Sequence, residues 1–257
     1  MRIRVLASGS KGNCTYVGAG SGALLIDCGL SVREALSRIQ AAGGDPALVR
    51  AILVTHEHAD HLHGVAAMAR RLGVPVYGTG GTLLSLAPAA GGRRPVRLVR
   101  TSPGEVAGID GFTVEPFATS HDAREPCGFT LRCGDLRFTS CTDSGVISDD
   151  ILGRLRASDA ILLESNHCPE MLRTGPYPEV LKRRIRSRHG HLSNPAAAVC
   201  LRALADDAGA VILGHLSEIN NTPEKALASA REGLGLYCGG VRVVVGKQHG
   251  PTEPVDL

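Results

Sequence analysis

Short apolar runs alternate with longer amphipathic stretches along most of the chain, and glycines and prolines separate them. The apolar runs over 23–27 and 51–54 predict buried strands, because each is short and bounded by polar or turn-forming residues. Helical periodicity over 32–42 follows Ser31, a suitable N-cap, and stops at Gly43-Gly44. The pattern therefore predicts a strand, a helix and a second strand in succession over 23–54.

The same reasoning extends to the rest of the chain. Strands are predicted over 2–7, 15–17, 74–77, 96–100, 111–117, 128–132, 135–140, 160–164, 211–213 and 241–245. Helices are predicted over 65–72, 79–86, 147–156, 177–188, 195–206 and 223–233, and a loop over 88–95. No linker, repeat or low-complexity segment divides the chain. We therefore expect one α/β domain over 1–257, with two β-sheets packed face to face and helices outside.

Composition narrows the class of protein. A chain of 257 residues that is 43% hydrophobic can bury one large core or two small ones. Its net charge of +3 permits an anionic substrate without requiring one. We expect neither a signal peptide nor a membrane span, because the sequence shows no suitable apolar segment. The eight scattered cysteines are typical of reduced thiols and predict a cytoplasmic protein.

The candidate chemistry centres on Thr55-His56-Glu57-His58-Ala59-Asp60-His61, directly after the strand at 51–54. In an extended segment His56 and His58 point the same way and can reach one metal ion. Asp60 and His61 are adjacent, so we expect them to splay apart and to suit a second ion. Histidines with carboxylates are typical of a catalytic zinc, manganese or iron site, whereas structural zinc sites prefer cysteine pairs, and Cys-x-x-Cys is absent. The alternative is a solvated histidine-rich loop.

Three more metal-capable side chains follow predicted strands: His121, Asp143 and His215. The carboxyl ends of strands are where open sheets expose functional groups. Taken singly, each has an ordinary alternative, since a histidine after a strand is often structural and Thr-Asp-Ser-Gly is often an Asx turn. Together they supply the remote partners that the histidine motif needs.

With these residues in this order, the chain resembles a metallo-β-lactamase-superfamily hydrolase over nearly its whole length. The resemblance implies a four-layer αβ/βα sandwich with two divalent metal ions at one rim of the sheets. It assigns the ligands in two sets bridged by one carboxylate: His56, His58 and His121 for the first ion, Asp60, His61 and His215 for the second, and Asp143 for both. It also implies that Asp27 orients a ligand histidine. Two such ions can share a water and lower its pKa, which suits esters, lactams and phosphodiesters alike.

Two later segments bear on the substrate. Glu164 ends a predicted strand, and His191 lies in Gly190-His191-Leu192-Ser193-Asn194 before a helix. They resemble the acid/base region of tRNA 3′-processing endonucleases in this superfamily, which implies that His191 protonates the leaving oxygen and Glu164 orients it. A phosphodiester expels a poor alkoxide leaving group, so a general acid assists its cleavage. The alternatives are a helix-terminal histidine without chemistry and a strand-end salt bridge.

The overall resemblance is to the small bacterial YycJ/WalJ-like branch, described as double-strand DNA 5′–3′ exonucleases. The shared features are Ser8–Asn13, Thr55–His61, Glu164–His167, Gly190–Asn194 and His215–Asn221. Cys168 departs from that branch, which usually has Asp there. The turn over 8–13 suits either a phosphate cradle or an ordinary hairpin.

Five cations in the seven residues 182–188 suit either a backbone-tracking patch or a solvated helix face. His167 and His189 are candidates for lining the cleft.

The sequence thus predicts a two-metal DNA exonuclease with Asp60, Glu164 and His191 as catalytic residues. It also predicts nucleic acid as the partner, no membrane association, and zinc, manganese or iron as the metal. Its rivals are a hydrolase of a small thioester, lactone or cyclic phosphodiester, and a metal-stabilised nucleic-acid-binding regulator. Metal identity, DNA or RNA preference, polarity and oligomeric state stay open.

Overall fold

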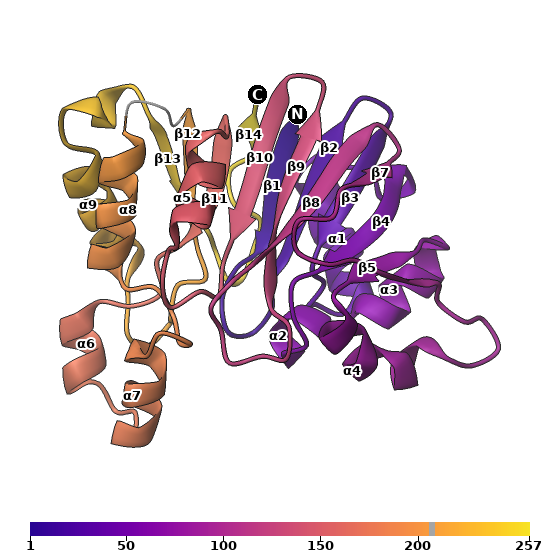
Figure 1. Cartoon of the computed structure of the whole chain (residues 1–257), viewed down its shortest axis with the longest axis horizontal. Helices are drawn as coiled ribbons and strands as arrows, with labels where there is room; N and C mark the ends of the chain where they lie inside the picture. Colours follow the sequence, from indigo (N-terminus) through magenta and orange to yellow (C-terminus); the bar gives the residue numbers. More distant parts are fainter. Residues whose placement is uncertain (206–208) are drawn as a thin grey trace. The chain divides into compact units, whose positions relative to one another are not determined.

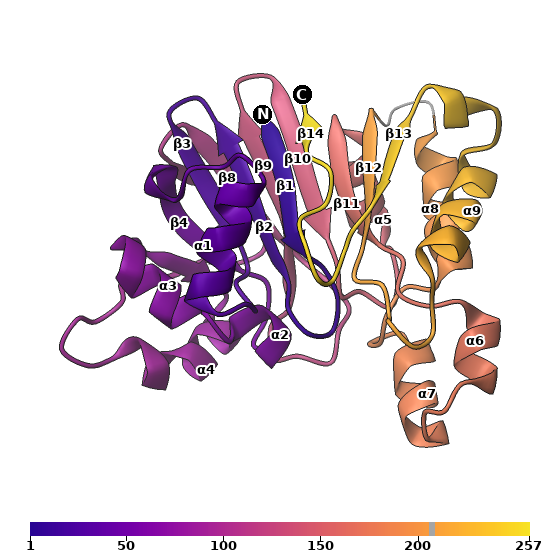
Figure 2. The same cartoon turned by 180° about the vertical axis from the view of Figure 1, so that it is seen from behind.

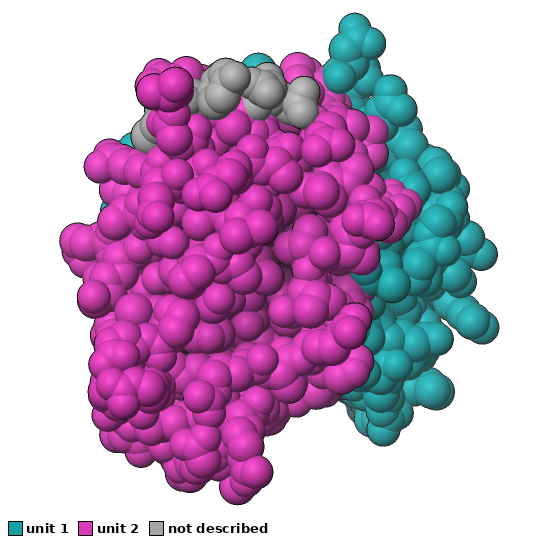
Figure 3. All heavy atoms as spheres, turned by 60° about the vertical axis from the view of Figure 1, so that its left-hand side comes forward, with its two compact units in different colours: residues 1–118, 123–135, 247–257 teal, residues 119–122, 136–246 magenta. Residues whose placement is uncertain are grey.

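The computed structural model describes residues 1–205 and 209–257. They form two compact units, which Figure 3 colours separately. Unit 1 comprises Met1–Ala118, Ala123–Asp135 and Lys247–Leu257, and unit 2 comprises Thr119–Asp122 and Leu136–Gly246. The described strands belong to two mixed sheets of seven strands each, and helices flank them, so the predicted α/β class is confirmed (Figure 1).

The first sheet lies within unit 1 and has the order β14-β1-β2-β3-β4-β5-β6. These strands are β1 (Arg2–Ala7), β2 (Cys14–Ala19), β3 (Gly22–Ile26), β4 (Val49–Val54), β5 (Val76–Gly78), β6 (Leu98–Arg100) and β14 (Val255–Asp256). Unit 1 also contains three antiparallel strands of the second sheet: β7 (Ala107–Ile109), β8 (Phe112–Ala118) and β9 (Cys127–Cys133). Strands β3 to β6 run parallel, so β3 and β4 end at the same edge.

Helices α1 (Val32–Ala41) and α3 (Val65–Leu72) pack on this sheet, where α1 contacts β1 and α3 contacts β4 (Figure 2). Ser31 begins α1 because its side chain accepts a hydrogen bond from the Glu34 amide at 3.3 Å. Both helices confirm the sequence prediction. Unit 1 further contains the single helical turn α2 (Ala59–Leu62), the helix α4 (Gly80–Ala90) and the 3₁₀ turn η1 (Pro46–Leu48).

The sequence prediction differs from the structure at several segments. Helix α4 continues through Pro88 to Ala90, although 88–95 was predicted to be a loop. Proline in a last turn removes a single backbone hydrogen bond, and the alanines around it favour a helix. The short elements α6 (Pro169–Thr174), β7 and β14 were not predicted. The predicted helix 195–206 is α8 (Asn194–Leu204), and residue 206 lies outside the described residues.

Unit 2 is built on four parallel strands in the order β13-β12-β11-β10. They are β10 (Leu136–Cys141), β11 (Ala160–Glu164), β12 (Ala210–Gly214) and β13 (Arg242–Val245). Cys141 lies beside Leu163, and Glu164 lies beside Gly214, so these strands end level with one another. The residues that follow them, Asp143 and His215, therefore emerge at one edge together with Glu164.

Helices α5 (Asp149–Arg156), α8 and α9 (Pro223–Leu234) accompany these strands, with η2 (Gly235–Gly239) after α9. Helix α5 contacts β10, and α9 contacts both α8 and β13. Helices α6 and α7 (Glu179–Arg186) lie beyond the carboxyl ends of the strands of unit 2 (Figure 1). Among the described residues, we find no helix with the length and apolar character needed to cross a bilayer.

Candidate metal centre

The end of β4 delivers the histidine motif, and Asp27 at the end of β3 organises it. Asp27 is buried and accepts hydrogen bonds from the Thr55 amide at 2.9 Å and the Thr55 hydroxyl at 2.9 Å. Its Oδ2 lies 2.8 Å from Nδ1 of His61. A carboxylate at Nδ1 holds that proton in place and leaves Nε2 of His61 as the nitrogen that can bind a metal. Asp27 therefore orients His61.

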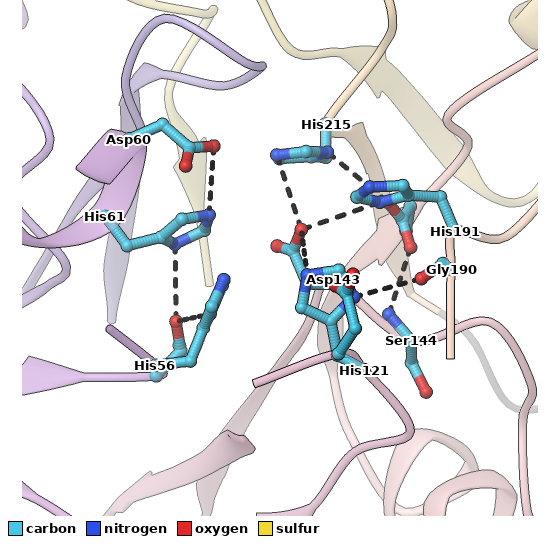
Figure 4. Close-up of polar contacts among 12 residues, drawn as sticks. His56, Asp60, His61, His121, Asp143, Ser144, Gly190, His191 and His215 are labelled. Atoms are coloured by element: carbon cyan, nitrogen blue, oxygen red, sulfur yellow. Dashed lines mark hydrogen bonds and ion pairs between the residues drawn. The ribbon is translucent and has the colours of Figure 1, made fainter. Parts of the chain in front are cut away.

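The imidazole rings of the motif gather in unit 1. The ring centroid of His56 lies 4.6 Å from that of His58 and 4.1 Å from that of His61. His58 precedes the one-turn helix α2, which carries Asp60 and His61. The expectation that these two neighbours splay apart is wrong, because Oδ2 of Asp60 lies 3.4 Å from Nε2 of His61 (Figure 4). The helical turn, which the extended interpretation lacked, brings the two ligand atoms together.

Asn13 is a residue of this cluster that the sequence did not single out. Its side-chain amide donates to Gly9 O at 3.1 Å, lies 3.2 Å from Oδ2 of Asp60 and lies 3.0 Å from Nε2 of His61. The amides of the turn over 8–13 are engaged within unit 1 at five of its six residues, all but Ser10. The turn thus supports the histidine motif, and few of its backbone amides remain available to a phosphate.

In unit 2, two candidate ligands, His121 and His215, converge on Asp143. Nδ1 of His121 lies 3.1 Å from Gly190 O, so it donates to that carbonyl and leaves Nε2 as the metal-binding nitrogen. This Nε2 lies 3.8 Å from Oδ1 of Asp143, and Nε2 of His215 lies 3.4 Å from the same oxygen (Figure 4). Asn166 donates to the His215 carbonyl at 2.8 Å and so fixes the turn after β12.

The buried Glu164 and the partly buried His191 form a hydrogen-bonded pair. Oε1 of Glu164 accepts from Nδ1 of His191 at 2.7 Å, and Oε2 accepts from the amides of Ser144 and Leu192, each at 3.1 Å. Burial disfavours the charge on Glu164, but protonated His191 outweighs it and lowers the pKa of this carboxyl. Burial also opposes protonation of His191, yet the Glu164 carboxylate outweighs it and raises the pKa of the imidazole. The pair therefore favours a charged imidazolium.

Three of the five cations in the basic run over 182–188 contact other groups of unit 2. Lys182 is buried and donates to Arg173 O at 2.9 Å. Arg186 pairs with Glu179 at 2.6 Å, and Arg184 forms an ion pair with Asp122. These contacts favour the interpretation of 182–186 as a structural helix face. Arg183 and Arg188 are exposed, as is His189, whose Nδ1 lies 3.3 Å from the Ser120 hydroxyl.

The donor sets fit divalent metal ions. In unit 2 the side chains of Asp143, Glu164, His191 and His215 each offer a ligand atom, and these atoms lie within 4.8 Å of one another. In unit 1 three imidazoles and the Asp60 carboxylate cluster, and the Asp27 carboxylate holds Nδ1 of His61. In unit 2 the Gly190 carbonyl holds Nδ1 of His121. Nitrogen and carboxylate oxygen donors of this kind suit zinc, manganese and iron.

A model of the beta-lactamase superfamily domain matches residues 23–216, which include every candidate ligand. The chain belongs to the metallo-β-lactamase superfamily. It is 37% identical to an exodeoxyribonuclease YycJ of Bacillus anthracis over 91% of this chain and 89% of the relative. It is 36% identical to an exodeoxyribonuclease WalJ of Streptococcus pneumoniae, with 91% of each chain covered.

The fold agrees with this membership. The metallo-β-lactamase fold protein YhfI from Bacillus subtilis superposes with a TM-score of 0.74 at 16% identity, covering 97% of this chain and 98% of that one. The predicted sandwich architecture is thereby confirmed. As a member of this superfamily with histidine and aspartate clusters, the chain is a metal-dependent hydrolase.

Proposed function

We propose that the chain is a cytoplasmic phosphodiesterase that uses two divalent metal ions to degrade DNA as a 5′–3′ exonuclease. The proposal keeps the ligand assignment made from the sequence and treats both units as one hydrolase domain. The names of the two relatives support a DNA substrate. The single observation that carries the phosphodiesterase proposal is the Glu164–His191 pair, with its hydrogen bond of 2.7 Å.

Bound divalent ions would supply a water of lowered pKa and charge neutralisation at the substrate phosphate. Asp60 is suited to accept a proton from the attacking water, because its carboxylate is held by the Asn13 side chain at 3.2 Å and remains partly exposed. An aspartate in that position can bind a metal ion and can also accept a proton. Asp60 is therefore proposed both as a metal ligand and as a catalytic residue.

His191 is the proposed proton donor. Its Nδ1 is committed to Glu164, so Nε2 is the nitrogen that can deliver a proton. The raised pKa keeps that proton on the ring near neutral pH. An alkoxide leaving from phosphorus needs a proton far more than a thiolate leaving from a thioester does. The pair therefore favours a phosphodiester over the small thioester of the first rival.

The test uses duplex DNA and duplex RNA labelled at either the 5′ or the 3′ end, with Mn²⁺ or Zn²⁺ added. We expect the wild type to release mononucleotides from the 5′ end of DNA. Asp60→Ala and His191→Ala are expected to slow this release by about 100-fold or more. His63→Ala is the matched control, because His63 is an exposed histidine beside the motif.

A wild type that hydrolyses a thioester while leaving both polymers intact would refute the nuclease proposal and establish the small-substrate rival. Release from the 3′ end alone would refute the polarity. Cleavage that is insensitive to His191→Ala would remove the proposed proton donor while leaving the hydrolase assignment intact.

A further inference from the structure

Unit 1 contains a hollow of about 320 Å³ at the end of the first sheet that lies opposite the histidine motif. Its walls include Arg4, Tyr16, Gly18, Gly43, Gly44 and Asp45. Strands β1, β3 and β4 begin at this end, as the pairing of Arg2 with Gly18 and of Ala23 with Val49 shows. His56 follows the other end of β4, so the hollow is separate from the metal-binding residues of unit 1.

Arg4 is the unusual residue of this hollow. Its side chain is only 7% exposed, and Nε and Nη1 are buried without a hydrogen-bond partner among the described residues. The nearest carboxylate, that of Asp256, lies 3.6 Å from Nη1, is 54% exposed and is equally distant from Arg2. A buried guanidinium carries five N–H donors and is costly to leave unsatisfied. The described part of the chain therefore provides no hydrogen-bond acceptor for these two nitrogens of Arg4.

The walls around Arg4 are shaped by glycines. Cβ atoms added to Gly18 and Gly44 would lie 3.1 and 3.3 Å from the ring of Tyr16, so side chains there would crowd the wall. An added Cβ at Gly43 would lie 3.8 Å from Nη2 of Arg4. The Tyr16 hydroxyl is fixed on the backbone of Asp45, donating to its carbonyl at 3.3 Å and accepting from its amide at 3.4 Å. The hollow is therefore preformed.

We propose that this hollow binds a phosphate group, as inorganic phosphate or as a small phosphate monoester, on the guanidinium of Arg4. The planar fork of arginine presents paired N–H donors that match two phosphate oxygens. Arg2 lines the same hollow and adds a second positive charge, while Asp45 is the acidic group on its wall. The volume falls at the lower end of the range for small-molecule sites, which admits a ligand of mononucleotide size.

The test is calorimetric titration of metal-free protein in EDTA, which keeps phosphate away from metal ions. The probes are inorganic phosphate, 2′-deoxycytidine 5′-monophosphate and, as the uncharged control, deoxycytidine. We expect saturable binding of a phosphate-bearing probe only, with a shift of the Arg4 Nε–H resonance. Binding of both phosphate probes assigns the site to the anion itself, and binding of the nucleotide alone assigns it to a monoester.

Arg4→Gln is expected to weaken this binding at least tenfold, whereas Arg50→Gln is expected to leave it unchanged. Arg50 is the matched control because it is an ion-paired arginine of the same unit outside the hollow. If Arg4→Gln does not fold, Arg4→Lys replaces it, since lysine keeps the charge but loses the fork. Absence of binding by the wild type, or equal binding by the folded Arg4 variant, would overturn the proposal and make Arg4 a structural counter-ion of Asp256.

Discussion

Replacing Glu164 by glutamine removes the charge that holds the proposed proton donor His191, and it also changes the carboxylate that lies 3.3 Å from Nδ1 of His215. The glutamine oxygen can still accept from the Ser144 and Leu192 amides, which bond to Oε2 at 3.1 Å. Its NH₂ group then faces Nδ1 of His191, where the carboxylate now accepts at 2.7 Å. Glutamine thus preserves shape and backbone contacts while removing the charge.

The expected loss of hydrolysis rate follows from two opposed influences on the pKa of His191. Burial lowers the pKa of this imidazole, and the Glu164 carboxylate is the main group that raises it above the ordinary value. Without the carboxylate, we expect the pKa of His191 to fall, because the main group that opposes the effect of burial is gone, and less of the imidazole is then protonated at neutral pH. A lost general acid costs roughly 10²- to 10⁴-fold, so we expect Glu164→Gln to slow DNA hydrolysis by about 100-fold.

The assay compares two substrates that differ in leaving group. Duplex DNA expels an alkoxide that needs a proton, whereas bis(4-nitrophenyl) phosphate expels a stable nitrophenolate that does not. We expect the nitrophenyl ester to lose less than about tenfold, because the general-acid contribution is small there. Glu170→Gln is the control, since it breaks an exposed glutamate–arginine pair of the same unit. Equal losses on both substrates would refute the assignment of His191 as proton donor.

Two further predictions concern metal binding and pH. Asp27→Asn is expected to weaken metal affinity by roughly 10- to 100-fold in chelator competition, because it removes the carboxylate at Nδ1 of His61, whereas Asp110→Asn at the surface is expected to change nothing. Burial lowers the pKa of His167 to about 4, so the folded state binds this proton more weakly than the unfolded state does. Stability from this group is therefore present above about pH 6.5 and is lost as the pH falls toward 4, by about 2 kcal/mol between pH 7 and 5. Urea unfolding in EDTA should show that His167→Gln loses less stability over this interval than the wild type, and parallel losses would contradict the prediction.

The sequence predicted the site where local pattern and sheet topology suffice. Parallel strands end at one edge, so a polar residue directly after each strand predicts a cluster, and Asp143, Glu164 and His215 do lie together in unit 2. The histidine motif follows β4 as expected. The placement of these residues needs only the identity of the strands and the residues that follow them, and their roles in metal binding and catalysis stay predictions.

The remaining details depend on tertiary contacts that no local pattern encodes. Asn13 contacts Asp60 and His61 from 47 and 48 positions away, whereas the glycine-rich turn that contains it suggested either a phosphate cradle or an ordinary hairpin. The basic run left open whether it was a nucleic-acid surface or a solvated helix face, and the structure shows that Lys182 donates to the Arg173 carbonyl of α6 and that Arg184 pairs with Asp122. The sequence gives the number of cationic side chains, but only the folded structure shows which of them already contact other groups.

Backbone conformation is another property that the sequence did not reveal. Among the described residues other than glycine, φ is positive at Asp27, Asp110, Asp143 and His215, and three of these four belong to the candidate site. A left-handed conformation costs an L-residue roughly 1–2 kcal/mol, and aspartate tolerates it better than most residues do. His215, with φ of 54°, is the one among the four that is not an aspartate. Its carbonyl is held by Asn166 at 2.8 Å, which keeps the turn in place.

This strain can be measured by comparing His215→Gly with His215→Ala. Both remove the imidazole, but only glycine relieves the left-handed backbone. Glycine gains about 1–2 kcal/mol from that relief and loses about 0.4–1 kcal/mol to the greater entropy of the unfolded chain, so we expect the glycine variant to be more stable by up to about 1.6 kcal/mol. At Ala203, an exposed position of α8, the order should invert, with glycine less stable by about 1 kcal/mol. Urea unfolding of the metal-free variants decides the matter. An alanine variant at 215 that equals or exceeds the glycine variant would show that the turn after β12 stores no strain.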